Sequence, residues 1–163
     1  MTSLWVYEDM LDRVAAMQKE AVAELTSDLP VAIGPAFSGT YPSVQNYLED
    51  LITFSSTENN WQETRQVRML VVMGQSTEGF NEELVRESLR YLQLITRYFQ
   101  KETRLKTAAG TYTTEPTYLE VIGTSLVSDP GVRAYQIGGE GQTKLGMAMI
   151  LHVPIFVMRG TSL

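Results

Sequence analysis

The sequence of 163 residues contains no cysteine and one histidine, His152. Disulfide scaffolds, thiolate zinc sites and cysteine nucleophiles are therefore excluded. With one histidine, a single chain also cannot build a multi-histidine metal site or a two-histidine acid–base pair. We expect no metal, no cofactor and no catalytic residue, and this expectation disfavours an enzyme.

Long hydrophobic runs and basic residues are also scarce. The longest apolar stretches, residues 69–73 and 146–157, are too short or too interrupted to span a bilayer, so we expect no membrane segment. Thirteen Lys and Arg residues against nineteen Asp and Glu residues give a formal net charge of -6. This balance argues against a surface that coats nucleic acid, although it leaves room for a local basic patch. The first residues lack the cationic segment of a signal peptide, so we predict an intracellular protein.

The remaining composition is that of one ordinary folded domain, with 44% hydrophobic and 20% charged residues. Apolar residues at helical spacing predict a first helix over residues 4–25. A loop rich in Pro and Gly follows over residues 30–42, with room for one short strand. Residues 44–56 fit either a helix or a strand, whereas residues 63–73 begin with the alternation of a strand. We therefore predict a β-hairpin with its turn at residues 57–60.

The second half of the chain contains the clearest helical pattern, over residues 78–103. We expect Ser76 or Thr77 to cap this helix, because short hydroxyl side chains are favoured at that position. Residues 107–117 are small and polar and predict a long loop. Three strand-like segments follow, at residues 118–127, 132–137 and 143–157.

The order of these elements is helix, strands, long helix, strands. The predicted strands outnumber what βαβ units would supply, so we expect a mainly antiparallel or mixed sheet. The fold class is therefore α+β, a single domain with two helices packed on one face of the sheet. Pro154 suggests a bulge or an edge position near the end of the last strand.

Few residues form a pattern that is typical of a chemical site. Residues 138–144 contain glycines and a lysine, but a phosphate loop needs Gly-Lys-Ser/Thr at the start of a helix, so we predict a hairpin tip. His152 has no local carboxylate or nucleophile to support catalysis, and we expect it to be structural. The basic residues form either a positive patch or separate ion pairs: Arg65, Arg68, Lys101, Arg104, Lys106 and Arg133.

The element order resembles that of the tail terminator proteins of long-tailed phages, which are also called tail completion or neck proteins. The resemblance rests on the N-terminal amphipathic helix, the Pro-rich crossover, the strand over residues 64–73, the helix over residues 78–103 and the final strand, LGMAMILHVPIFVM. It covers nearly the whole chain and includes no diagnostic motif. The segment at residues 107–117 is longer than this family leads us to expect. Head–tail stoppers, adaptors and tail-tube-like subunits have similar size and strand content, and they are the alternatives.

The resemblance implies a structural virion protein of the tail or neck, assembled in the host cytoplasm. Its implied partners are copies of itself in a hexameric ring, the tail tube protein, and a head–tail connector or stopper. Such a ring caps the tube, ends its polymerisation and joins it to the head. DNA would pass through the ring without sequence-specific binding.

Exposed hairpins are the parts of a ring subunit that we expect to reach neighbouring molecules, because unpaired strand edges accept further strands. The candidate arms are residues 57–63, 107–117 and 138–144. Two other hypotheses remain: a hydrolase that uses acidic residues and a divalent metal, and a small adaptor that forms no ring. The candidate contact residues in the three arms are Glu58, Asn59, Asn60, Trp61, Tyr112, Glu140, Gln142 and Lys144.

Overall fold

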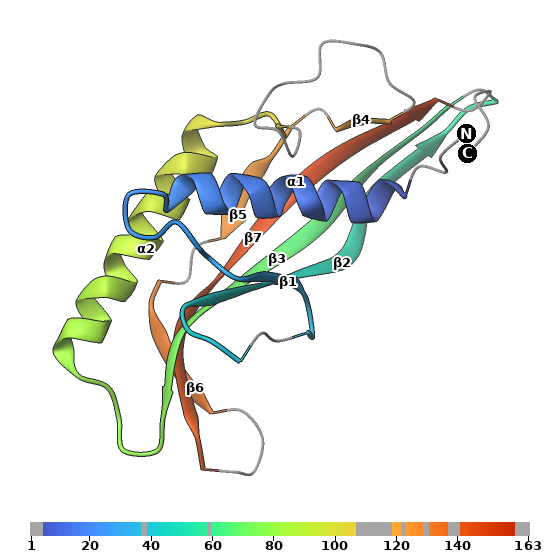
Figure 1. The fold of residues 1–163 in the computed structure, drawn as a ribbon. Helices are drawn as coiled ribbons and strands as arrows, with labels where there is room; N and C mark the ends of the chain where they lie inside the picture. The colour runs from blue at the N-terminus through green and yellow to red at the C-terminus, as the bar shows by residue number, and fades with distance from the viewer. Residues whose placement is uncertain are drawn as a thin grey trace.

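Two long antiparallel strands, β3 (Asn60–Ser76) and β7 (Thr143–Met158), form the centre of the structure (Figure 1). They pair from Asn60 opposite Met158 to Ser76 opposite Thr143. The structure is a computed structural model that describes residues 5–36, 39–58, 60–106, 119–121, 123–128, 131–136 and 141–158. The other elements of this described part are α1 (Val6–Ala21), β1 (Val31–Ile33), β2 (Ser43–Ser56), α2 (Glu82–Lys101), β4 (Leu119–Val121), β5 (Ser125–Ser128) and β6 (Arg133–Gln136).

The strands form one mixed sheet in the order β1-β2-β3-β7, and β4, β5 and β6 follow one another along the outer side of β7. Only β1 and β2 are parallel among the described pairs; the others are antiparallel. The predicted hairpin is confirmed, because β2 and β3 pair antiparallel across the turn at residues 57–60.

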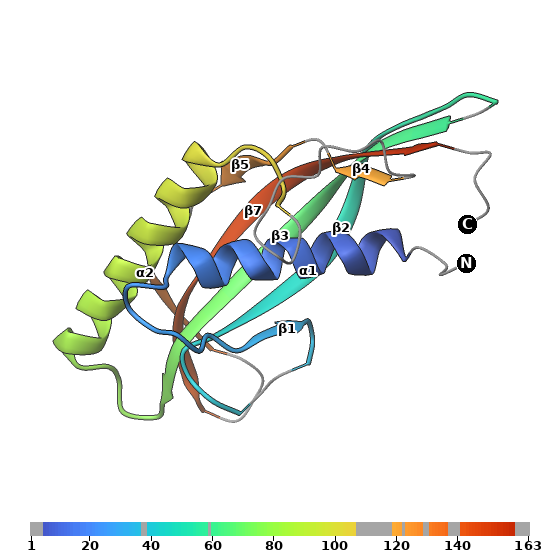
Figure 2. The ribbon, with the colours of Figure 1, turned by 45° about the horizontal axis from the view of Figure 1, so that its top comes forward.

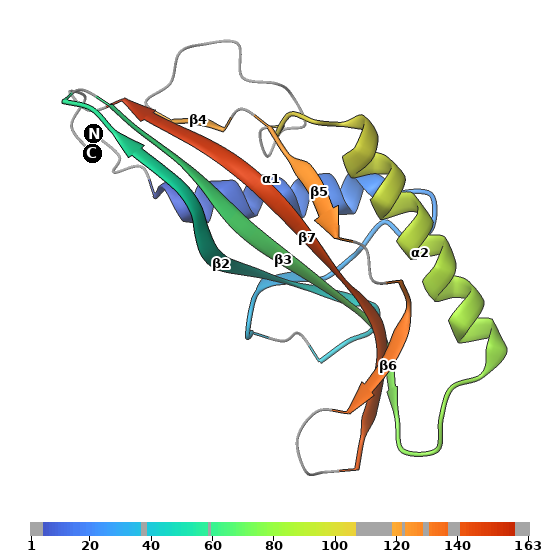
Figure 3. The ribbon, with the colours of Figure 1, turned by 180° about the vertical axis from the view of Figure 1, so that it is seen from behind.

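Both helices lie on the same face of the sheet, as predicted. The side chain of Gln18 in α1 forms a hydrogen bond with that of Asn46 in β2, and the hydroxyl of Thr96 in α2 contacts the sulfur of Met149 in β7. Asn46 and Met149 both align with Met69 of β3, and side chains directly opposite one another share a face of a sheet. Figures 1 and 3 show the helices over one face, while no described helix covers the other.

Strand periodicity explains which residues form the core. Side chains alternate between the two faces, so every second residue of β7 points toward the helices. These positions are buried: Leu145, Met147, Met149, Leu151, Val153, Ile155 and Val157. Helix α2 adds Tyr91, Ile95 and Phe99, which are spaced four residues apart and therefore share one helical face. His152 points to the other face, with Ala148, Ile150 and Pro154, as its position in the strand predicts.

The predicted helix cap was wrong. Ser76 still belongs to β3, where it pairs with Thr143, and α2 begins only after Asn81. The side chain of Asn81 accepts a hydrogen bond of 2.8 Å from the backbone of Leu84, which is the geometry of an N-cap. Strand pairing continues to Ser76, and α2 begins later than predicted. Both helices are shorter than predicted, since α1 is Val6–Ala21 and α2 is Glu82–Lys101.

The predicted strand over residues 118–127 is two strands in the structure, β4 and β5. Thr124 interrupts it: its backbone donates to the carbonyl of Thr103, and its hydroxyl donates to the carbonyl of Glu102. These bonds hold the chain against the end of α2 rather than against β7. Pro154 lies beside this break, between the residues of β7 that pair with β4 and those that pair with β5. A proline has no N–H to donate, which suits a position without a partner strand on one side.

Candidate interaction surface

One end of the sheet forms an arm, made by residues 51–56 of β2, 60–65 of β3 and 153–158 of β7, with β4 paired along the outer side of β7 (Figures 1 and 2). The arm lies at the end of the sheet where α1 begins and β7 ends (Figure 1). The register of β2 shifts between Leu48 and Thr53, and pairing is then regular from Thr53 to Ser56. A bulge of this kind bends a strand and increases its twist.

Large apolar side chains are exposed on β2 where it enters the arm. Leu51 and Ile52 are each 43% exposed and Phe54 is 57% exposed. Strand β1 ends opposite Asn46, so no described strand pairs with the outer edge of β2 from Leu48 to Ser56. We name this segment the β2 edge. It combines backbone hydrogen-bonding groups that no described strand pairs with exposed apolar area.

A buried charged cluster supports the base of the arm on the helix side. Glu63 is 4% exposed, and its carboxylate lies 3.5 Å from Nε of Arg65. The Arg65 guanidinium donates to the hydroxyl of Tyr7 at 3.1 Å and lies 5.0 Å from the centre of that ring. Burial, together with the carboxylate of Glu63, raises the pKa of Tyr7. These contacts fix the start of α1, where Trp5 is 70% exposed, against the arm.

The opposite end of the sheet is polar. The Tyr41 hydroxyl donates to the side chain of Gln75 at 2.6 Å, and the Gln75 amide donates to Gln142. A groove of about 590 Å³ lies here, lined by Tyr41, Gln75, Gln142 and residues 76–78. Lys144 aligns with Gln75 on one side and Tyr135 on the other.

The predicted contact residues do not form one surface. Glu58 is exposed at the turn between β2 and β3, and Asn60 begins β3 beside it. Trp61 is half-buried and packs against the hydrophobic core. Gln142 and Lys144 lie at the other end of β7, roughly 50 Å away at the usual rise of a strand. Asn59, Tyr112 and Glu140, together with the predicted loop at residues 107–117, lie outside the described residues.

The basic residues include three that form ion pairs rather than a shared patch. Arg65 contacts Glu63 at 3.5 Å, Arg68 contacts Glu49 at 3.1 Å, and Lys106 contacts Glu20 at 3.1 Å. Hydrogen bonds to Tyr98 and Glu20 raise the pKa of the Lys106 ammonium, and hydrogen bonds from Tyr98 and Lys106 lower the pKa of the Glu20 carboxyl.

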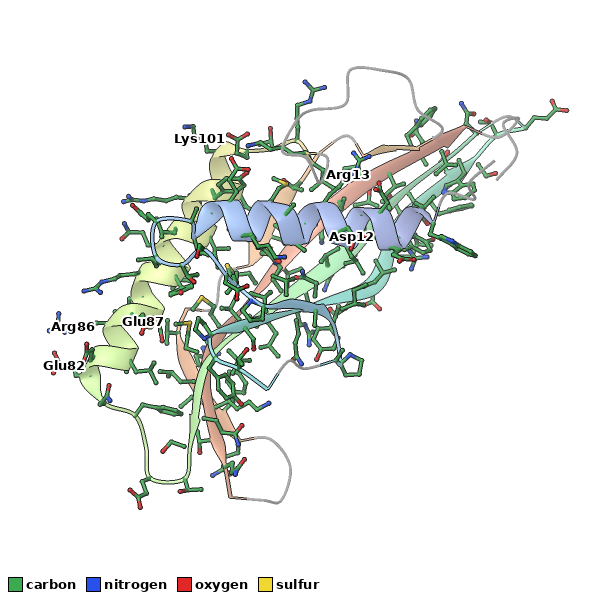
Figure 4. All side chains as sticks on the ribbon, in the orientation of Figure 1. Asp12, Arg13, Glu82, Arg86, Glu87 and Lys101 are labelled. Carbon is green, nitrogen blue, oxygen red and sulfur yellow. The ribbon has the colours of Figure 1, made fainter. Side chains whose placement is uncertain are left out.

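The outer face of α2 carries charged side chains of both signs (Figure 4). Glu82 and Arg86 pair along the helix, and a groove of about 600 Å³ runs beside them between α2 and Leu25. Within the described ranges, no group of three or more His, Asp or Glu side chains is placed to hold a metal ion. No helix in those ranges is long and apolar enough to cross a membrane.

The interpretation of the sequence missed Leu51, Ile52, Phe54 and Trp5. A signal was present, since Leu51, Ile52 and Phe54 are apolar within four residues and break the alternation expected of a half-buried strand. Large apolar residues are assigned to the core by default. Their exposure depends on how far the helices extend over the sheet, which the strand sequence does not encode.

The fold of this chain, a mixed sheet with two helices on one face, is similar to that of one chain in a known virion structure. One chain of a solved structure, described as "Virion of native gene transfer agent (GTA) particle", superposes with a TM-score of 0.52. The match covers 94% of this chain and 99% of that chain, at 9% sequence identity. A scan against models of protein families and a search of curated proteins both find no match. At this identity, the likeness shows a common fold along nearly the whole chain.

Proposed function

We propose that this chain is a structural virion protein that forms a ring at the end of a phage-like tail tube. The observation that carries the proposal is the match of the complete fold to a chain of a virion particle, with 94% and 99% of the two chains covered. The ring ends polymerisation of the tube and joins the tube to the head connector. DNA passes through the ring without sequence-specific contacts.

The arm and the β2 edge support a role in assembly. Monomeric proteins protect the edges of their sheets, because an unpaired edge is a template for another strand. This chain instead presents the exposed side chains of Leu51, Ile52 and Phe54 there. We also propose that the chain has no catalytic activity. The residue types of the sequence support this, since cysteine is missing and the single histidine lies on the face of the sheet that no described helix covers.

The test uses the tail tube protein of the same particle. Tubes are assembled with and without this chain, and their lengths are measured by negative-stain electron microscopy. A terminator gives tubes of defined length that stop growing, whereas tubes without it are longer and more variable. Tubes with the same length distribution in both samples contradict the proposal.

The same experiment separates the alternative neck proteins. A head–tail stopper or adaptor leaves tube length unchanged and binds particles on the head side. A tail-tube-like subunit polymerises into tubes by itself. Native mass spectrometry of the purified chain gives the number of subunits, and we expect six.

A further inference from the structure

Apolar side chains are exposed at the base of the arm, along the β2 edge and at the start of α1. Leu51 aligns with Arg65 and Phe54 aligns with Glu63, so both apolar side chains lie on the face of the sheet that carries the helices. Arg65 donates to the hydroxyl of Tyr7, which brings that ring to the same side. The exposed apolar side chains in this part of the molecule are Trp5, Tyr7, Leu51, Ile52 and Phe54.

The same part of the chain is acidic, and each of its basic residues is already paired. Residues 5–13, 48–68 and 153–158 contain seven Asp and Glu residues and three Arg residues. The arginines form ion pairs with three of the carboxylates: Arg13 with Asp9, Arg65 with Glu63, and Arg68 with Glu49. No ion pair or hydrogen bond within the described residues engages the four carboxylates that remain: Glu8, Asp12, Asp50 and Glu58. Arg159, which follows β7 and lies outside the described residues, leaves the balance negative.

The backbone of the β2 edge can accept a further strand. Proteins commonly protect such an edge with lysine, proline or a bulge. The β2 edge contains neither Lys, Arg nor Pro, and its bulge lies before Thr53, so residues 53–56 remain in regular register. A strand added there would gain main-chain hydrogen bonds from these residues and apolar contacts with Leu51 and Phe54.

We propose that the β2 edge binds an extended strand of a different protein, whose apolar centre is flanked by Lys or Arg. The exposed carboxylates of Asp50 and Glu58 precede and follow residues 53–56, so basic residues at both ends of the added strand meet opposite charge. The inference goes beyond the proposed function and does not depend on it, because it concerns a surface of the single chain.

A second copy of this chain does not supply such a strand. Strands β1, β4 and β5 contain no Lys or Arg, and Arg133 of β6 already takes part in other contacts. Each copy also carries a net charge of -6, so two acidic surfaces repel one another. The basic residues of the described part that have no partner there lie on helices instead: Lys19, Arg90, Arg97 and Lys101.

Two short peptides test the proposal. They share the core Val-Thr-Val-Thr-Val, and one carries two Lys at each end whereas the other carries two Glu at each end. Binding of each labelled peptide to the purified chain is measured by fluorescence anisotropy. We expect the Lys peptide to bind about ten-fold more tightly or better, and we expect this difference to shrink as salt is added. Hydrogen exchange followed by mass spectrometry should show slower exchange at residues 51–56 with the Lys peptide.

Variants separate the contribution of charge from that of apolar contact. Asp50→Lys/Glu58→Lys should weaken binding of the Lys peptide about ten-fold or more, because it reverses both flanking charges. The matched control, Glu78→Lys/Glu83→Lys, makes the same change in net charge at exposed positions outside the arm and should bind normally.

Removal of an apolar side chain should weaken binding to a similar extent. Phe54→Ser should weaken binding of the Lys peptide about ten-fold or more, because a few large side chains carry most of the stability of an interface. Leu89→Ser, at an exposed apolar position on α2, is the control and should bind normally.

Four results would overturn the inference. The first two are no binding of the Lys peptide and equal affinity for the two peptides. The third is binding without slower exchange at residues 51–56, which would place the contact elsewhere. The fourth is slower exchange at residues 51–56 when the chain alone is concentrated, which would show that a second copy covers the edge. None of these results involves tail tubes, so tube length tests the proposed function separately.

Discussion

A pair of buried amides holds α1 against the sheet, and breaking it tests whether this contact stabilises the fold. Gln18 and Asn46 exchange two hydrogen bonds of 2.8 Å, and both side chains are fully buried. Asn46→Leu leaves the donor and the acceptor of the Gln18 amide buried without partners. Each unsatisfied group costs about 1–3 kcal/mol, so for two groups we expect a loss of about 2–6 kcal/mol in the free energy of unfolding.

The double variant Gln18→Met/Asn46→Leu replaces both partners with apolar groups of similar size. It should recover most of the loss, because no polar group remains buried and unsatisfied. The assay is urea unfolding followed by circular dichroism, at one protein concentration because self-association also stabilises the chain. The reasoning is refuted if either Asn46→Leu or Gln18→Met alone lowers the free energy of unfolding by less than about 1 kcal/mol. It is also refuted if the effects of these two single variants simply add in the double variant.

Three further predictions concern the sheet, the core and the pH dependence. Gly146→Ala should lower the free energy of unfolding by about 2 kcal/mol or more in urea, because the new Cβ would clash with the backbone carbonyl oxygen of Val71. Wild-type stability would show that the two strands can move apart to admit the methyl group. Phe99→Ala should lower the free energy of unfolding by about 3–5 kcal/mol, because the ring is buried. The exposed control, Leu89→Ala, should lower it by about 0.5 kcal/mol or less. Equal losses for the two variants would contradict the assigned core. Burial raises the pKa of Tyr98 from 10.0 to about 12, so the unfolded chain loses this proton first and stability should fall between those pH values. Tyr98→Phe should make this fall shallower in urea unfolding between pH 9 and 11.5, and an unchanged slope would count against the assignment.

The sequence predicts the elements whose patterns are set by burial on one face. The long final strand is recognisable because its alternate residues face the helices, and α2 because Tyr91, Ile95 and Phe99 form one stripe. Residues 44–56, whose sequence fits either a helix or a strand, form a strand because β3 supplies a partner along most of their length. That choice depends on pairing between strands rather than on local preference.

The errors arise where distant contacts override local patterns. Thr124 breaks the strand over residues 118–127 because its backbone donates to Thr103, 21 residues earlier in the chain. Ser76 does not cap α2 because it pairs with Thr143 in β7. The β2 edge was missed for the same reason: its exposure depends on where α1 and β1 end, and neither boundary is encoded in the sequence of β2.

The position of this chain in an assembled particle tests the account most directly. Particles that carry a tagged copy are labelled with a gold-conjugated antibody and imaged by electron microscopy. Gold at the junction of head and tail, and at no other position, is the result that the proposed function predicts. Gold along the length of the tail, at its distal end, or nowhere on intact particles would contradict it.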